Sequence, residues 1–222
     1  MSSWFSGPPR VVPHRWHGGA AVEAPDHGTV LSWSVDGTSA PVVMGPRTRA
    51  RYWHNVKAAA GCVRLRVAPG LGHALLGRPV RDIADRAVPL SEFDLDFEVL
   101  MRDAGPAPDR RVGLLRQATA LFGAGSGAQP EQVQKAARRL HVSERHLRGL
   151  FTDAVGMPPR LYTQIARVRV VLDNPGMPLP DVAMLAGYYD QSHMTAEFRR
   201  LMGAPPAAFR AGRWPALESC TG

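Results

Sequence analysis

The sequence predicts an α+β protein in which a small β-rich N-terminal domain precedes an all-helical domain. Short apolar stretches separated by glycine and proline fill roughly the first hundred residues, a pattern typical of antiparallel strands. Beyond residue 109, apolar residues recur at helical spacing. The 222 residues are 45% hydrophobic and 21% charged, which allows two compact cores and excludes a wholly disordered chain.

Four strands are predicted in the first part, because short apolar stretches recur about every ten residues and turn residues separate them. They favour an antiparallel sheet, a sandwich or a partial barrel. A short helix is expected over residues 71–76. Residues 91–103 fit both the alternation of a strand and one face of a helix, and we favour the helix. The predicted strands are residues 29–35, 41–44, 51–56 and 62–67.

A domain boundary is expected at residues 104–109, where one glycine and two prolines interrupt regular structure. It divides the chain into a β-rich domain over 1–105, a helical domain over 106–214 and a tail over 215–222. The formal net charge of +8 is distributed unevenly, with 12 Lys+Arg against 10 Asp+Glu up to residue 105 and 15 against 9 beyond it. A basic excess favours a polyanionic partner, and here it belongs mainly to the helical part.

The predicted helices of the second part each place their apolar residues on one face, as Leu161, Ile165 and Val168 do. Two of them follow a residue whose side chain can accept a hydrogen bond from the first turn, Ser143 and Asp190. The predicted helices are residues 109–122, 131–140, 144–153, 160–172, 180–186 and 191–202.

An internal repeat appears when the second part is shifted by 47 residues. Each copy predicts a helix, a tight turn and a capped helix, which is the pattern of a helix-turn-helix unit. A linking helix over residues 160–172, about 20 Å long, separates the copies. The shift places Ala136 on Ala183, His146 on His193, Phe151 on Phe198, Gly156 on Gly203, the pair 158–159 on 205–206, and Tyr162 on Phe209.

The second helix of each unit is the candidate DNA-binding element, because an α-helix fits the major groove and its outward side chains reach base edges. Leu147, Leu150 and Phe151 are expected in the core of the first unit, and Met194, Phe198 and Leu201 in that of the second. If both helices face the same way, they would enter major grooves about 34 Å apart. The candidate DNA-binding residues are Arg145, His146, Arg148, Gln191, Ser192, His193, Thr195, Arg199 and Arg200.

Not all of these candidates carry the same expectation. The two histidines fit either DNA contact or packing against the preceding helix. Arg199 and Arg200 are expected at phosphates or at no contact, rather than at bases. For Gln191, Ser192 and Thr195, capping and solvation are the alternatives to DNA contact.

The second part resembles the C-terminal domain of the AraC/XylS transcription regulators. The resemblance rests on residues 178–193 (PLPDVAMLAGYYDQSH), 198–206 (FRRLMGAPP) and 209–210, and on 136–147 with 156–159 (GMPP) in the first unit. It implies two helix-turn-helix units on a linking helix, which bind asymmetric sites in double-stranded DNA and regulate transcription, with RNA polymerase as a candidate further partner. The sequence departs from the family at Lys135, at His141 in the first turn, and at Gly149 and Ala196, where long side chains are frequent.

The first part resembles the short β-rich sensor or partner domain of some of these regulators, similar to a cut-down cupin. The resembling stretches are residues 32–37, 43–47, 63–70, 74–77 and 88–90. It leaves open whether this domain binds a small-molecule effector or only a protein, whether the chain is a monomer or a homodimer, and whether it activates or represses.

An enzyme in the β-rich domain, targeted by DNA binding, is the remaining alternative. His14, His17, His54 and His73 are candidate metal ligands, but no acidic residue accompanies them at a suitable spacing. We therefore expect no catalytic residue, no metal and no cofactor. The distant Cys62 and Cys220 and the lack of an apolar run of about 20 residues predict a cytoplasmic protein without membrane contact. Trp4, Trp16, Trp33 and Trp53 are expected in the core rather than in a ligand cage.

Overall fold

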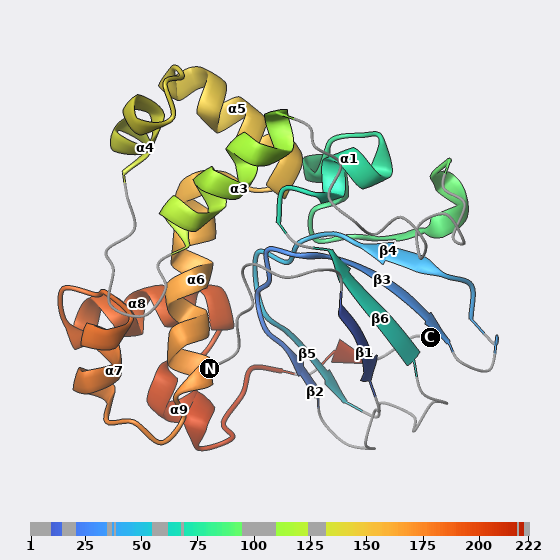
Figure 1. The fold of residues 1–222 in the computed structure, drawn as a ribbon. Coiled ribbons are helices and arrows are strands. Elements are labelled where there is room, and N and C mark those ends of the chain that lie inside the picture. The colour runs from blue at the N-terminus through green and yellow to red at the C-terminus, as the bar shows by residue number, and fades with distance from the viewer. Residues whose placement is uncertain are drawn as a thin grey trace.

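The computed structural model describes residues 10–14, 21–34, 37, 39–54, 62–67, 69–94, 110–123, 132–216 and 218–219. The strands gather on one side of the molecule and the helices of the second part on the other (Figure 1). The predicted α+β class is confirmed. The boundary expected at 104–109 and the candidate residues Trp4, Trp16 and His17 lie outside the described residues.

Two sheets form the N-terminal part. The first has the order β1-β6-β3-β4-β7 and is antiparallel throughout, and the second has the order β2-β5-β8, in which β8 runs parallel to β5. All four predicted strands are present, as β3 to β6. The strands are β1 Arg10–His14, β2 Ala21–Glu23, β3 Thr29–Ser34, β4 Val42–Met44, β5 Arg51–His54, β6 Cys62–Val67, β7 Ala87–Pro89 and β8 Glu218–Ser219.

The first sheet has its own apolar core, in which Leu31, Val43 and Leu65 are almost completely buried. The predicted short helix is α1 (Gly72–Leu76), and two 3-10 helices, η1 (Val80–Ile83) and η2 (Leu90–Glu92), add Val80, Ile83 and Leu90 to this core. Trp33 and Trp53 are half-buried, and Trp33 packs against the same core.

The helix expected from residue 91 does not begin there. The 3-10 turn η2 ends at Glu92, and the backbone of Phe93 is extended because its buried ring packs into the core of the sheet. Residues 95–103 of that prediction lie outside the described residues.

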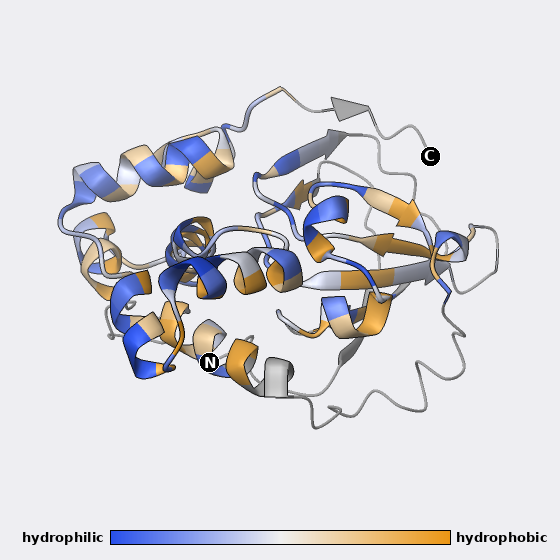
Figure 2. Cartoon of the chain, turned by 90° about the horizontal axis from the view of Figure 1, so that it is seen from above, coloured by the Kyte–Doolittle hydropathy of each residue, from blue (hydrophilic) through white to orange (hydrophobic). Residues whose placement is uncertain are grey.

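The helical part contains all six predicted helices, with ends that differ by two residues at most. The linking helix α6 runs between the group α3–α5 and the group α7–α9 (Figure 1). The helices show alternating hydrophobic and hydrophilic stretches, as expected of amphipathic helices that share one core (Figure 2). They are α3 Arg110–Phe122, α4 Val133–Arg139, α5 Glu144–Val155, α6 Pro159–Asp173, α7 Leu179–Leu185, α8 Gln191–Met202 and α9 Pro206–Arg210.

Local chemistry sets both ends of the two candidate DNA-binding helices. The Ser143 hydroxyl accepts a hydrogen bond from the His146 amide at 3.1 Å, and the Asp190 carboxylate accepts one from the His193 amide at 2.7 Å. Both predicted caps are therefore confirmed. Each helix ends where a glycine adopts the left-handed conformation, with φ of 80° at position 156 and 74° at position 203.

The strands and helices pack directly on each other. Besides the contacts of α1 and η1 with α5, the backbone amide of Ala50 donates a hydrogen bond to the Leu201 carbonyl at 2.9 Å. The Tyr52 hydroxyl donates another to the carbonyl of Met202, and its burial raises its pKa to about 12. These bonds attach β5 and the segment before it to the C-terminal end of α8.

A buried polar cluster joins the sheet to α6. Arg169 donates to the Pro25 carbonyl at 3.0 Å and lies 3.4 Å from the Asp26 carboxylate, which also pairs with Arg66. Beside this cluster, the centres of the His27 and Tyr162 rings are 4.1 Å apart. Burial, offset only in part by Asp26, lowers the pKa of His27 to about 3. Burial by itself raises the pKa of Asp26. The charge and hydrogen bond of Arg66 and the charge of Arg169 lower it by more, so the pKa of Asp26 lies below its ordinary value.

The free energy of unfolding is expected to fall as the pH decreases from 6.5 towards 3. The His27 imidazole titrates near 3 in the folded chain and near 6.5 when unfolded, so in this interval the unfolded chain binds one more proton there. Denaturant unfolding at a series of pH values measures this. His27→Phe, which keeps a ring against Tyr162, should remove this contribution above about pH 4, where ordinary aspartates are ionised. Parallel pH curves for the two proteins would contradict the assignment.

The two caps should each contribute about 1 kcal/mol to the free energy of unfolding. Ser143→Ala and Asp190→Ala each leave a first-turn amide without its side-chain acceptor. Ser143→Gly and Asp190→Gly are matched controls, because glycine at a cap costs only a few tenths of a kcal/mol. Alanine variants as stable as the wild type would mean that the hydroxyl or carboxylate does not act as a cap there.

Candidate nucleic-acid interface

The two helix-turn-helix units, α4–α5 and α7–α8, differ by one residue in their turns. The Val142 amide bonds to the Ala137 carbonyl, and the Tyr188 amide bonds to the Ala183 carbonyl. Ala183 therefore corresponds to Ala137, and the match of Ala136 with Ala183 predicted from the sequence is wrong. The first helices are related by a shift of 46 residues, because α4 begins at 133 and α7 at 179. The shift of 47 holds for α5 and α8.

The extra residue of the second turn is Tyr189, whose side chain is 94% exposed. The two turns share a left-handed residue, His141 with φ of 53° in the first and Gly187 with φ of 74° in the second. Glycine adopts this left-handed conformation without the steric penalty that a Cβ brings. This is the physical reason why His141, at a turn position where the family often has glycine, is a departure.

Helix α5 buries the face that its apolar residues predict. Leu147 and Phe151 are inaccessible to solvent, and the Phe151 ring packs edge-on against Phe122 and Tyr162 at 5.1 and 5.2 Å. Leu150 is half-buried. The three candidate DNA-binding side chains of this helix, Arg145, His146 and Arg148, are exposed.

One of these arginines already has a partner on its own helix. Arg148 donates to the Glu144 carboxylate at 2.9 Å, one helical turn away, and both side chains are substantially exposed. At Gly149, one position further, an added Cβ would meet no atom within 4 Å, so this face of α5 is open.

Helix α8 buries Met194, Phe198 and Leu201, as predicted. Thr195 is half-buried rather than outward. Arg200 donates to the Gln164 side chain of α6 at 2.7 Å, so its guanidinium fastens α8 to the linking helix. The exposed candidates of this helix are Gln191, Ser192, His193, Arg199 and Arg200.

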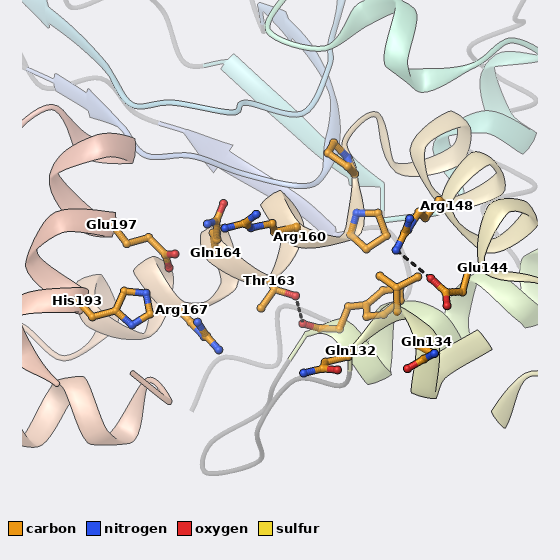
Figure 3. Close-up of a pocket in the computed structure, with 14 residues that line it drawn as sticks. Gln132, Gln134, Glu144, Arg148, Arg160, Thr163, Gln164, Arg167, His193 and Glu197 are labelled. Carbon is orange, nitrogen blue, oxygen red and sulfur yellow. Dashed lines mark hydrogen bonds and ion pairs between the residues drawn. The ribbon is translucent and has the colours of Figure 1, made fainter. Parts of the chain in front are cut away.

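A cavity of about 600 Å³ lies between the two units, lined by residues of α4, α5, α6 and α8 (Figure 3). Of the sequence candidates, only Arg148 and His193 line it. The residues that the sequence analysis missed are on α6, where Arg160, Gln164 and Arg167 recur at helical spacing and line the cavity. That spacing was visible in the sequence, but only the tertiary structure shows what it faces.

In the described part of the chain, no group of three or more His, Cys, Asp or Glu side chains lies close enough to hold a metal ion. The side chains of His14 and His54 are outside the described residues, and His73 is half-buried. None of the described helices has the length and apolar composition needed to span a membrane.

Three solved structures are similar to part or most of this chain. A ToxT variant from Vibrio cholerae is 10% identical, with coverage of 93% of this chain and 98% of that one and a TM-score of 0.49. A regulator with an AraC-type DNA-binding domain from Chromobacterium violaceum is 22% identical, with coverage of 46% and 92% and a TM-score of 0.40. The C-terminal domain of AraT, a response regulator from Geobacillus stearothermophilus, is 18% identical, with coverage of 51% of this chain and 97% of that one and a TM-score of 0.43.

The sequence itself shows where the family resemblance lies. No curated protein matches the chain. Residues 136–212, however, match the family model of a helix-turn-helix domain, over a stretch that includes α5, α6, α7 and α8. Residues 136–212 therefore form a helix-turn-helix domain of the AraC type, the kind of domain that occurs in DNA-binding transcription regulators.

Proposed function

We propose that the chain binds specific sites in double-stranded DNA by placing α5 and α8 in two successive major grooves. The observation that carries this proposal is the pair of capped helices, each with one face buried and polar or cationic side chains on the other, joined by α6. Their placement toward opposite ends of α6, which is about 22 Å long, suits grooves on the same side of the duplex (Figure 1).

In the first half of the site, base recognition is assigned to Arg145 and Arg148. An arginine that contacts guanine O6 and N7 is the commonest specific contact in the major groove. Arg148 has to break its ion pair with Glu144 to reach a base. Among the described residues, Arg145 forms no ion pair that would have to break first. Since Gly149 supplies no side chain, these two arginines carry most of the discrimination, with His146 as a secondary contact.

In the second half of the site, recognition is assigned to polar side chains near the start of α8. A glutamine such as Gln191 can pair with the N6 and N7 edge of adenine, and Ser192, His193 and Thr195 can donate to or accept from either base type. Arg199 is assigned to a phosphate. Arg200 combines a phosphate contact with its bond to Gln164, which keeps α8 in place.

The N-terminal domain, which we take to end near residue 105, is assigned a regulatory role. It contacts α5, α6 and α8 directly, so an effector, a second copy of the chain or RNA polymerase that shifted this domain would also shift the DNA-binding helices. The helical domain over 106–214 then supplies the DNA contacts.

Arg145→Ala and Arg148→Ala should each weaken binding by about 1–3 kcal/mol and relax base preference in one half of the site only. Selection of bound duplexes from a random pool, followed by titration of the selected sequence, measures both effects. Arg86→Ala, which removes an exposed arginine of the N-terminal domain, is the matched control. A selected motif with two separated halves is expected, and unchanged preferences in both variants would refute the assignment.

Binding should weaken steeply with salt, because arginines that neutralise phosphates release condensed counterions. A plot of log affinity against log salt concentration should be linear, with a slope of about −0.9 for each phosphate contacted. Titrations of the wild-type chain at several salt concentrations test this. A flat plot would be incompatible with binding to duplex DNA.

A further inference from the structure

The linking helix has a polar face that its spacer role leaves unexplained. Arg160, Gln164 and Arg167 lie four and three residues apart and so share one side of α6. Tyr162 and Ile165, on the other side, are fully buried. The polar face lines the cavity between the two units, with α8 on one flank and α4 and α5 on the other (Figure 3).

The accessible charge of this cavity is positive. Three arginines line it, Arg148, Arg160 and Arg167, together with two carboxylates. The carboxylate of Glu144 already accepts a hydrogen bond from Arg148, and Glu197 is only 7% exposed. With three arginines against two carboxylates, the lining has a net formal charge of +1.

The two α6 arginines are held differently. Arg160 is exposed near the start of the helix. The Arg167 guanidinium carbon lies 5.4 Å from the centre of the Tyr188 ring, a cation–π distance that orients the side chain towards the second unit. Seven residues of helix place the two positions about 10 Å apart along its axis.

If α5 and α8 occupy successive major grooves, the minor groove between them faces α6. That groove is about 6 Å wide, and its two edges are rows of phosphates. We propose that Arg160 and Arg167 bind phosphates on the two edges of this central minor groove, which makes α6 a third DNA-contacting element. This inference rests on the proposed function and adds a contact that involves no base.

Phosphate contacts set the position of a protein on DNA but do not distinguish sequences. Loss of an α6 arginine should therefore weaken binding equally for every sequence placed between the two halves of the site. Loss of Arg145, in contrast, should change the preferred bases. The two kinds of contact are separable by experiment.

The experiment uses the full chain and the duplex selected with the wild-type protein. Arg160→Ala and Arg167→Gln should each reduce the magnitude of the salt slope by about 1 and leave the base preference of both halves unchanged. Glutamine is chosen at 167 because its length retains packing on Tyr188. Arg86→Ala, at a position that does not line the cavity, should keep the wild-type slope, and thermal unfolding of each variant verifies that it is folded.

A second measurement identifies the phosphates. Uncharged methylphosphonates at the edges of the central minor groove should weaken wild-type binding, whereas the Arg160→Ala protein should lose less from the substitution opposite its missing side chain. Wild-type salt slopes in both arginine variants would overturn the inference while the proposed function stands. A methylphosphonate substitution that weakens the Arg160→Ala protein as much as the wild type would do the same. Failure of the wild-type chain to bind any selected duplex would instead overturn the proposed function and this inference with it.

Discussion

The burial of one face of α6 is the constraint on which the rest of the structure depends. Tyr162, Ile165 and Val168 are fully excluded from solvent, and they form the part of the core that both helix-turn-helix units share. The Tyr162 ring lies between Phe151 of α5 and His27 of the N-terminal domain. A displacement of α6 would therefore disturb two units and a sheet at once, which is why its orientation is so strongly determined.

The N-terminal sheets stabilise this arrangement through polar contacts as well as apolar ones. Tyr52 and Ala50 bond to the backbone at the end of α8, and Asp26 pairs with Arg169 of α6. Such contacts are directional and break when the sheet moves by about an ångström, because hydrogen bonds tolerate little change in distance and angle. A shift of the sheet by that much would therefore cost these bonds.

Two side chains of the surface that we propose to face DNA already have partners within the chain. The bond of Arg148 to Glu144 and that of Arg200 to Gln164 restrict two long side chains. Restriction lowers the conformational entropy that binding must remove, but the first bond also competes with a base. Exposed ion pairs within one helix are worth only about 0.3–0.5 kcal/mol, so the competition with DNA is weak.

The sequence by itself determined the elements whose causes are local. Helical periodicity predicted α3 to α8, the side chains of Ser143 and Asp190 predicted the starts of α5 and α8, and turn residues predicted β3 to β6. Strands β1, β2 and β7 were missed, because Pro13 interrupts the apolar run of β1 and the other two have only three residues each. Strand β8 lies in what composition presented as a tail, and its pairing with β5 joins positions more than 160 residues apart.

Only the tertiary structure decided which residues share a site. Packing placed His27 against Tyr162, although the two lie 135 positions apart in the chain. It also corrected the register of the repeat, because the extra Tyr189 is visible only when hydrogen bonds show which alanines correspond. The polar face of α6 was present in the sequence as a spacing, but its position between α5 and α8 follows from how both units fold onto that helix. Local chemistry thus fixes where a helix begins and ends, whereas long-range burial fixes what each of its faces meets.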